Sequence, residues 1–273
     1  MDTDKRRETH SQTRPKRRQN HTITWQHAFV PLALVAFIIL WELVVSWRHY
    51  PAFFLPTPRR VVARFLVALQ EGSLQAHTLV TLREVFLGLA LGLSVATTLG
   101  YALAKSRTLE RILSPYIVAS QAIPIVALAP LLVVWFRGGS LSKVLVCALT
   151  LFFPVLINTM VGIRNVDAEL MDLMRSLRAS RWQILRLLEL PASLPVFFGG
   201  LKVGVTLSVI GAVVGEFVGA DRGLGFLVNL ARGIFDTPLM FVALFTLMFI
   251  ALALYLMVSA LERWLLKWRW PED

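Results

Sequence analysis

Long apolar runs, separated by short polar segments, dominate the pattern along this chain. A helix needs about 20 apolar residues to cross roughly 30 Å of hydrocarbon. Runs that approach or exceed this length cover residues 28–47, 79–104, 115–136, 141–163, 194–219 and 239–261. The pattern predicts an all-α, polytopic membrane protein with about six transmembrane helices.

The segments outside these runs suggest how the chain is divided. Residues 1–24 are polar and basic and are expected to form a disordered tail. Thr57 and Pro58 form a helix start signal, and the amphipathic helix that follows is too short to span, so we expect it at the membrane interface. The predicted divisions are the tail 1–24, the first transmembrane helix with the external amphipathic helix 25–74, the main transmembrane domain 75–265 and a second tail 266–273.

Composition supports the membrane interpretation. The 273 residues are 56% hydrophobic and only 16% charged. The net charge of +11 could indicate nucleic acid, but the basic residues lie between apolar runs, where Lys and Arg set membrane topology. We therefore expect no nucleic-acid partner. The single cysteine, Cys147, lies inside an apolar run and is interpreted as a packing residue.

The distribution of Lys and Arg predicts the orientation. If the N-terminus is cytoplasmic, the cytoplasmic segments hold more than twice as many Lys and Arg residues as the external ones. Since cytoplasmic loops are enriched in these residues, both termini and the segment 164–193 are predicted to be cytoplasmic.

Prolines interrupt the middle of the chain at Pro115, Pro124, Pro130 and Pro154. Each removes a backbone donor, so helices should kink or break there. In a bilayer, such backbone is tolerated when it is buried in protein or faces water. For Pro124 and Pro130 the sequence leaves two interpretations open, a translocation path and a plain structural kink.

Three polar residues extend the pathway hypothesis. Gln121 and Asn158 lie on proline-containing spans, where they could face a water-filled path or form helix-to-helix hydrogen bonds. Glu216 lies near the outer end of the fifth span. It could belong to an outer gate, or it could pair with Arg222 or Arg232, which we favour.

Motifs for catalysis are missing. The chain has no G-x-x-x-x-G-K-[ST], no H-E-x-x-H and no Cys/His cluster. Polar groups at membrane depth are few; they are Glu42, Arg83, Glu84, Asn158, Lys202 and Glu216. We therefore predict no catalytic residue, no metal site and no nucleotide site on this chain, which argues against an intramembrane enzyme.

The most informative polar segment runs from residue 167 to residue 191, after the fourth span. Asp167 places an acidic group at the start of one short helix, where the helix dipole favours it. Ser180 is a good N-cap for a second helix, which Pro191 is expected to end. Such a projecting helix pair can be gripped by another protein; the alternative is an amphipathic pair that rests on the lipid surface.

This loop resembles the EAA coupling loop of permease subunits in binding-protein-dependent ATP-binding-cassette (ABC) importers. The family pattern is E-A-A, three residues, G, nine residues, I-x-L-P. Here it corresponds to Asp172-Leu173-Met174, Arg178 in place of the glycine, and Leu188-Glu189-Leu190-Pro191. The stretches 120–131, 152–159 and 215–225 are similar to the sulfonate, taurine, nitrate, thiamine-precursor and riboflavin branch of the family.

The resemblance implies a role and partners for the chain. It would be the permease of an importer in the cytoplasmic (inner) membrane of a prokaryote, working with an ATPase dimer that binds ATP–Mg, an external solute-binding protein and a second permease copy, with homodimer and heterodimer both open. The implied ATPase contacts are Asp172, Leu173, Met174, Arg175, Ser176, Arg178, Trp182 and Pro191.

The substrate is less well defined by the resemblance. Riboflavin or a thiamine pyrimidine precursor is expected first, and a sulfonate, taurine or nitrate next. A stand-alone secondary transporter or channel is the alternative function. The projecting loop and the lack of a visible inverted repeat argue against it.

Overall fold

The computed structural model describes residues 23–48 and 51–267. These residues form two compact units, 23–48 and 51–267. In the first unit, α1 (Ile23–Arg48) covers the first predicted span. The predicted tail 1–24 lies, except for its last two residues, outside the described residues, and Ile23 already begins α1.

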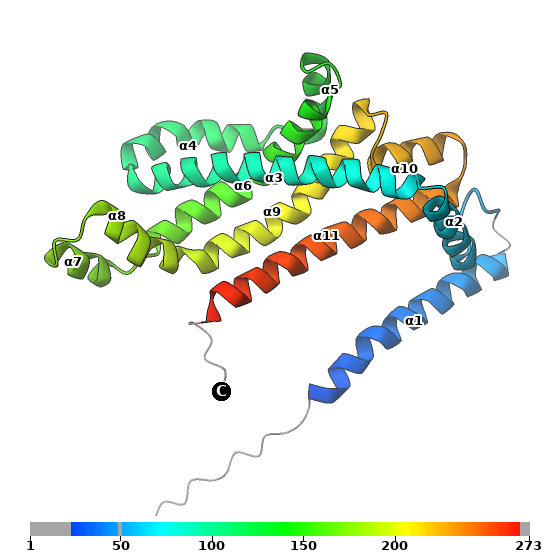
Figure 1. The fold of residues 1–273 in the computed structure, drawn as a ribbon, viewed down its shortest axis with the longest axis horizontal. Helices are drawn as coiled ribbons and strands as arrows, with labels where there is room; N and C mark the ends of the chain where they lie inside the picture. The colour runs from blue at the N-terminus through cyan, green and yellow to red at the C-terminus, as the bar shows by residue number, and fades with distance from the viewer. Residues whose placement is uncertain (1–22, 49–50, 268–273) are drawn as a thin grey trace, which may run out of the picture. The chain divides into compact units, whose positions relative to one another are not determined.

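The second unit is built on long helices that run side by side (Figure 1). They are α3 (Ser73–Lys105), α6 (Ser140–Arg164), α9 (Leu190–Gly219) and α11 (Thr237–Leu265). Among the described residues, these four helices are long and apolar enough to cross a membrane, if the helical residues just before α9 are counted as part of it. One pair of helices with a sharp bend between them makes a fifth span if the pair is counted as one. The predicted helical membrane fold is confirmed.

Helix α6 forms the centre of this unit, between α3 and α9. Gly88, Gly92 and Gly100 of α3 face it closely. A Cβ at Gly88 would collide with the Cβ of Cys147, and one at Gly100 would lie 2.8 Å from the Leu156 carbonyl oxygen. The glycines therefore let the two backbones approach, as is typical of helix pairs in membranes.

The predicted third span, 115–136, is wrong as one continuous helix. The structure has α4 (Arg107–Gln121) and α5 (Ile125–Trp135), bent by 94° from one another. Pro124 is the N-cap of α5, with extended backbone angles. Because a proline lacks the N–H that would continue α4 and restricts the residue before it, the helix breaks here.

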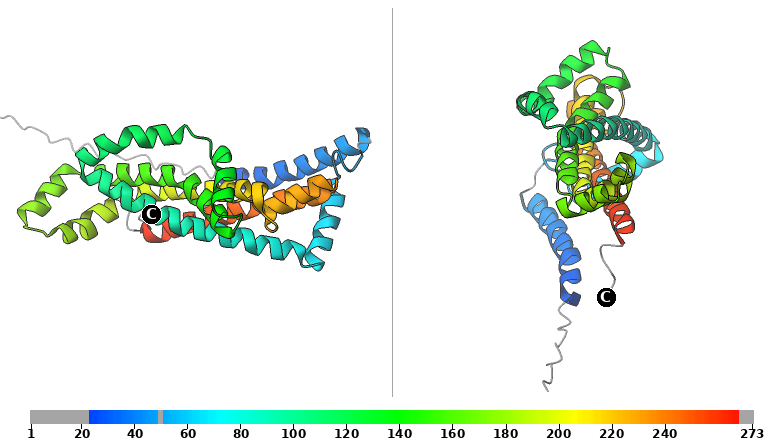
Figure 2. Two further views of the ribbon diagram at one scale, coloured as in Figure 1. Left: turned by 90° about the horizontal axis from the view of Figure 1, so that it is seen from above. Right: turned by 90° about the vertical axis from the view of Figure 1, so that its left-hand side faces the viewer.

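The remaining helices lie at the ends of the unit. Helix α2 (Pro58–Gln70) starts as predicted, since the Thr57 hydroxyl accepts a hydrogen bond from the Arg60 N–H at 3.4 Å. It contacts α3 and α11. Helix α10 (Leu224–Gly233) lies at the same end as the start of α3, and α7 (Ala168–Ser176) and α8 (Arg181–Ile184) project from the opposite end (Figures 1 and 2).

Candidate functional site

The first helix of the projecting loop, α7, has defined ends. The Asp167 carboxylate accepts a hydrogen bond from the Glu169 N–H at 2.8 Å, which caps its start. At its other end the Ala179 N–H donates to the Met174 carbonyl oxygen at 3.0 Å, as in a Schellman motif. Arg178 occupies the left-handed position of this turn, with φ of 54°. The turn that a glycine makes in the family pattern thus forms here with an arginine.

The second helix, α8, begins with a complete capping box. The Ser180 hydroxyl accepts from the Gln183 N–H at 3.3 Å, and the Gln183 side chain accepts from the Ser180 N–H at 2.7 Å. This confirms Ser180 as the predicted cap.

The prediction that Pro191 ends this helix is wrong. The chain continues through one π-helical turn, η1 (Leu185–Glu189), into α9. The Leu190 N–H bonds to the Leu185 carbonyl oxygen in this wider turn. Pro191 then falls in the first turn of α9, where its missing N–H is tolerated.

The projecting loop exposes apolar side chains. Leu177, Trp182 and Leu187 are 69%, 66% and 66% exposed. Of the other predicted contact residues, Asp172, Leu173, Arg175, Ser176 and Arg178 are exposed, and Met174 and Pro191 are half-buried. Large apolar side chains next to exposed charges, on an element that projects from its unit, are typical of a protein interface.

The root of the loop is tied to α3 and α4 by charges that sequence reasoning did not single out. Glu189 is buried, and its carboxylate forms an ion pair with Lys105 at the end of α3. The Tyr101 hydroxyl also donates to it, at 3.4 Å. On the other side of the loop, Arg164 makes two hydrogen bonds of 2.6 Å to Glu110 of α4. These two ion pairs join the root of the loop to both helices.

A second buried glutamate lies at the other end of α9. The Glu216 carboxylate accepts hydrogen bonds from the Thr81 hydroxyl, at 2.7 Å, and from the Gly225 N–H. Thr81 in turn accepts from the Leu224 N–H at 2.8 Å. Glu216 thus fastens the start of α10 to α3, and it forms no ion pair with Arg222 or Arg232, the pairing favoured from the sequence.

Two further charged side chains complete this buried cluster. Glu84 lies within hydrogen-bonding reach of Glu216, while its Oε2 is buried without a protein partner. The buried Lys143 ammonium donates to the Gly138 carbonyl oxygen at 2.7 Å. The cluster therefore gathers two carboxyl groups and one ammonium group in the interior, between α3, α6 and α9.

The proposed pathway residues do not gather at one place. Gln121, Pro124 and Pro130 are exposed on the bent α4–α5 pair. The Asn158 amide donates to the Pro154 carbonyl oxygen of its own helix at 2.8 Å, and its side chain packs on Gly200 of α9. Glu216 is buried and holds the hydrogen bonds to Thr81 and Gly225 described above. A role for these residues in a pathway stays a prediction.

Comparisons with known proteins agree with this geometry. Residues 88–268 match the family model described as the binding-protein-dependent transport system inner membrane component. The chain is 48% identical to the riboflavin transport system permease protein RibX of Chloroflexus aurantiacus, over 93% of this chain and 95% of that protein. It is 34% identical to the formylaminopyrimidine transport permease protein ThiX of Halalkalibacterium halodurans, over 87% and 94%.

A solved structure shares the fold. A chain of the MetNI methionine ABC transporter, in an inward-facing conformation, matches with a TM-score of 0.55 and 20% identity, over 68% of this chain and 91% of that chain. The family match covers most of the transmembrane helices of the second unit, and the solved structure shows the same fold. The chain belongs to the binding-protein-dependent transport system inner membrane components and is a permease subunit of an ABC importer.

Proposed function

We propose that this chain is the membrane subunit of a riboflavin importer, and that two copies form the translocation unit. The substrate proposal rests on one observation, the 48% identity to a riboflavin transport permease over nearly the whole of both chains. A thiamine pyrimidine precursor is the second candidate, supported by the 34% identity to a formylaminopyrimidine transport permease.

The projecting loop is the proposed docking site for the ATPase. Its exposed apolar residues Leu177, Trp182 and Leu187 offer area for burial, and the exposed charges of Asp172 and Arg175 flank them. The partner ATPase binds ATP–Mg, and this chain contributes the contact. In this account the loop and both chain termini are cytoplasmic.

The root of the loop is the proposed transmission point. When the ATPase dimer closes, the loop shifts, and the Glu189–Lys105 and Arg164–Glu110 pairs carry the shift to α3 and α4. Beside this root lies a cavity of about 400 Å³, lined in part by Tyr101, Thr159 and Ser193, which leaves room for the side chains to repack.

The second copy is expected on the bent α4–α5 pair. Within the described residues no side chain of α4 is buried, and Tyr116, Val126 and Trp135 are 71%, 63% and 68% exposed. A helix pair that exposes large apolar side chains in one copy is well suited to a two-fold contact with another. Gln121, Pro124 and Pro130 would then lie near the interface between the copies.

Uptake of radiolabelled riboflavin tests the substrate proposal. The permease, its partner ATPase and its solute-binding protein are reconstituted in proteoliposomes with ATP inside. We expect ATP-dependent accumulation of riboflavin that excess unlabelled riboflavin abolishes and formylaminopyrimidine does not. Accumulation of labelled formylaminopyrimidine alone would establish the second candidate, and uptake of either without the ATPase would contradict the importer assignment of this chain.

A further inference from the structure

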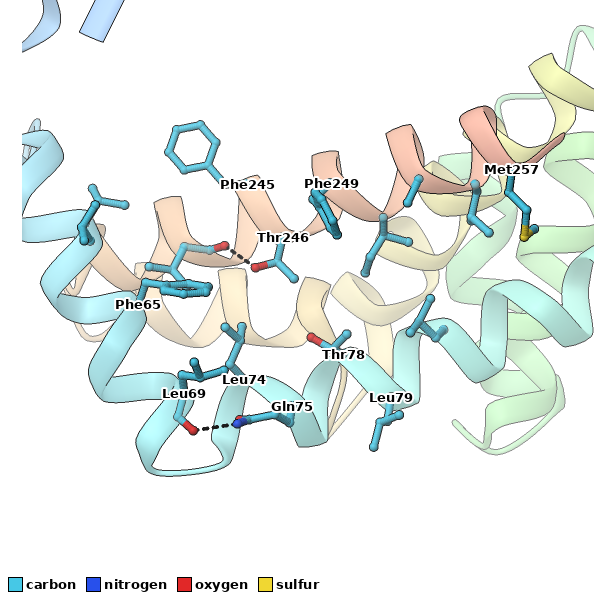
Figure 3. A pocket seen from close by; sticks show the side chains of 17 residues that line it. Phe65, Leu69, Leu74, Gln75, Thr78, Leu79, Phe245, Thr246, Phe249 and Met257 are labelled. Atoms are coloured by element: carbon cyan, nitrogen blue, oxygen red, sulfur yellow. Dashed lines mark hydrogen bonds between the residues drawn. The ribbon is translucent and has the colours of Figure 1, made fainter. Parts of the chain in front are cut away.

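A long apolar groove lies apart from the loop and from the buried glutamates. It has a volume of about 1010 Å³ and is lined by α2, α3 and α11. Figure 3 shows labelled side chains of all three helices around this space, among them Phe65 of α2, Leu79 of α3 and Phe249 of α11. Leu79 and Phe249 are 67% and 70% exposed, so the groove is open to its surroundings.

The few polar side chains in the groove offer little to a polar ligand. The Gln75 amide donates to the Leu69 carbonyl oxygen at 2.7 Å, and the Thr246 hydroxyl donates to the Val242 carbonyl oxygen at 2.8 Å (Figure 3). These two side chains are already bonded within the protein, and Thr78 is the other polar residue of the lining. The groove therefore suits a hydrocarbon and not the polar solute that an importer carries.

The dimensions of the groove suit one acyl chain. Its lining residues on α11 run from Val242 to Met257. At 1.5 Å per residue these span about 22 Å, more than the roughly 15 Å depth of hydrocarbon in one leaflet. Because α3 and α11 are membrane-spanning helices, the material that meets an open apolar groove between them is lipid.

Positive charge lies beside one end of the groove. Arg59 and Arg60 are exposed in the first turn of α2, and among the described residues neither forms an ion pair. Arg64, on the same helix, is instead held by Asp236 at 2.8 Å. Arg59 precedes the groove residue Val62 by one helical turn, so the two side chains share a side of α2. A guanidinium at this place matches the phosphate of a phospholipid.

We propose that this groove, formed by α2, α3 and α11, is a binding site for an anionic phospholipid. One acyl chain lies along α3 and α11, and the phosphate is held by Arg59 and Arg60 of α2. The bound lipid fills the space between the amphipathic helix and the two spans, and it fixes α2 at the membrane interface. This inference does not depend on which solute is transported.

Photo-crosslinking in nanodiscs tests the site. The assembled transporter is reconstituted with phosphatidylglycerol that carries a diazirine in one acyl chain, and labelled peptides are mapped by mass spectrometry. We expect labelling centred on Phe249 and Met257 of α11 and on Leu79 of α3. The variant Ala253→Trp fills the groove and should lower this labelling several-fold, whereas Leu252→Trp, on an exposed position of α11 outside the groove lining, should leave it unchanged.

Separate variants test whether the arginines of α2 bind the lipid headgroup. Arg59→Gln and Arg60→Gln together should remove the preference for diazirine phosphatidylglycerol over the matching phosphatidylcholine, while acyl labelling by the latter remains. Equal labelling in Ala253→Trp and Leu252→Trp would show boundary lipid only and overturn the proposal. Absence of groove labelling in the assembled wild type would show that protein covers the groove, which also overturns it.

Discussion

A buried glutamate lies at each end of helix α9, one in the residue directly before it and one within its last turn, and both are held by side chains of α3. Glu189, at the end next to the projecting loop, pairs with Lys105, whose side chain is 41% exposed. Glu216, at the end next to α10, is held by the Thr81 hydroxyl and a backbone N–H, all buried. A pair with one exposed member can exchange that partner for solvent, whereas a fully buried network cannot do so without a large loss. We therefore expect a movable end of α9 at the loop and a fixed end at α10.

The largest effect is expected from Gly223→Ala at the fixed end. Gly223 has φ of +117°, and an added Cβ would collide with the Glu216 carboxyl group. The strain and the displaced carboxylate should cost about 3 kcal/mol, measured by reversible unfolding in mixed micelles. Gly233→Ala, with no neighbour within 4 Å, is the control and should change stability much less. Equal losses for the two variants would contradict a tight network at Glu216.

The two carboxyl groups at the fixed end should respond differently to amide substitution. Glu216→Gln turns an amide donor toward the Gly225 N–H and should cost about 2 kcal/mol. Glu84→Gln keeps a side chain of similar size and leaves the bonds of Glu216 to Thr81 and Gly225 in place, so it should cost less than about 1 kcal/mol. The same unfolding measurement separates them. The reverse order would show that Glu84, and not Glu216, makes the contacts that hold this end.

At the movable end, Arg178→Gly should tighten the turn after α7. A non-glycine residue in the left-handed region costs about 1 kcal/mol, which glycine avoids. We expect slower hydrogen exchange at the Arg178 and Ala179 amides, followed by mass spectrometry. Faster exchange would show that the Arg178 side chain, and not the backbone turn, stabilises this segment.

The smallest stability change is expected for Arg175→Glu. Arg175 and its partner Asp172 are largely exposed, so their ion pair contributes little to folding. The variant should insert and unfold like the wild type but lower the substrate-stimulated ATPase activity of the assembled complex. Arg222→Glu, an exposed arginine at the fixed end, is the matched control and should keep that activity. Unchanged coupling in Arg175→Glu would count against docking through this loop.

The sequence predicted local features near both ends of α9, and it missed the contacts between residues that are far apart in the chain. Thr57 and Ser180 act as helix caps as expected, and a helix starts at Asp167 as expected, because these signals depend on residues a few positions apart. The ion pair of Lys105 with Glu189 joins residues far apart in the chain, and no local pattern reveals such a pair.

The prolines also show what a local sequence pattern cannot predict. Pro124 breaks a predicted span, whereas Pro191 and Pro154 lie within helices that continue. The difference depends on where the freed backbone groups lie. A π-helical turn precedes Pro191 and accommodates it in the first turn of α9, and α6 around Pro154 is packed between α3 and α9. Neither circumstance can be read from a proline in an apolar run.

The ion pair of Glu189 with Lys105 is the proposed link through which the loop drives α3. The most direct measurement is the number of solute molecules imported per ATP hydrolysed in proteoliposomes for Glu189→Gln, with Lys105→Arg as a variant that keeps the charge. We expect Glu189→Gln to retain substrate-stimulated hydrolysis while import per ATP falls several-fold, and Lys105→Arg to stay near the wild type. An unchanged ratio in Glu189→Gln, or hydrolysis and import that fall together, would contradict transmission through this ion pair.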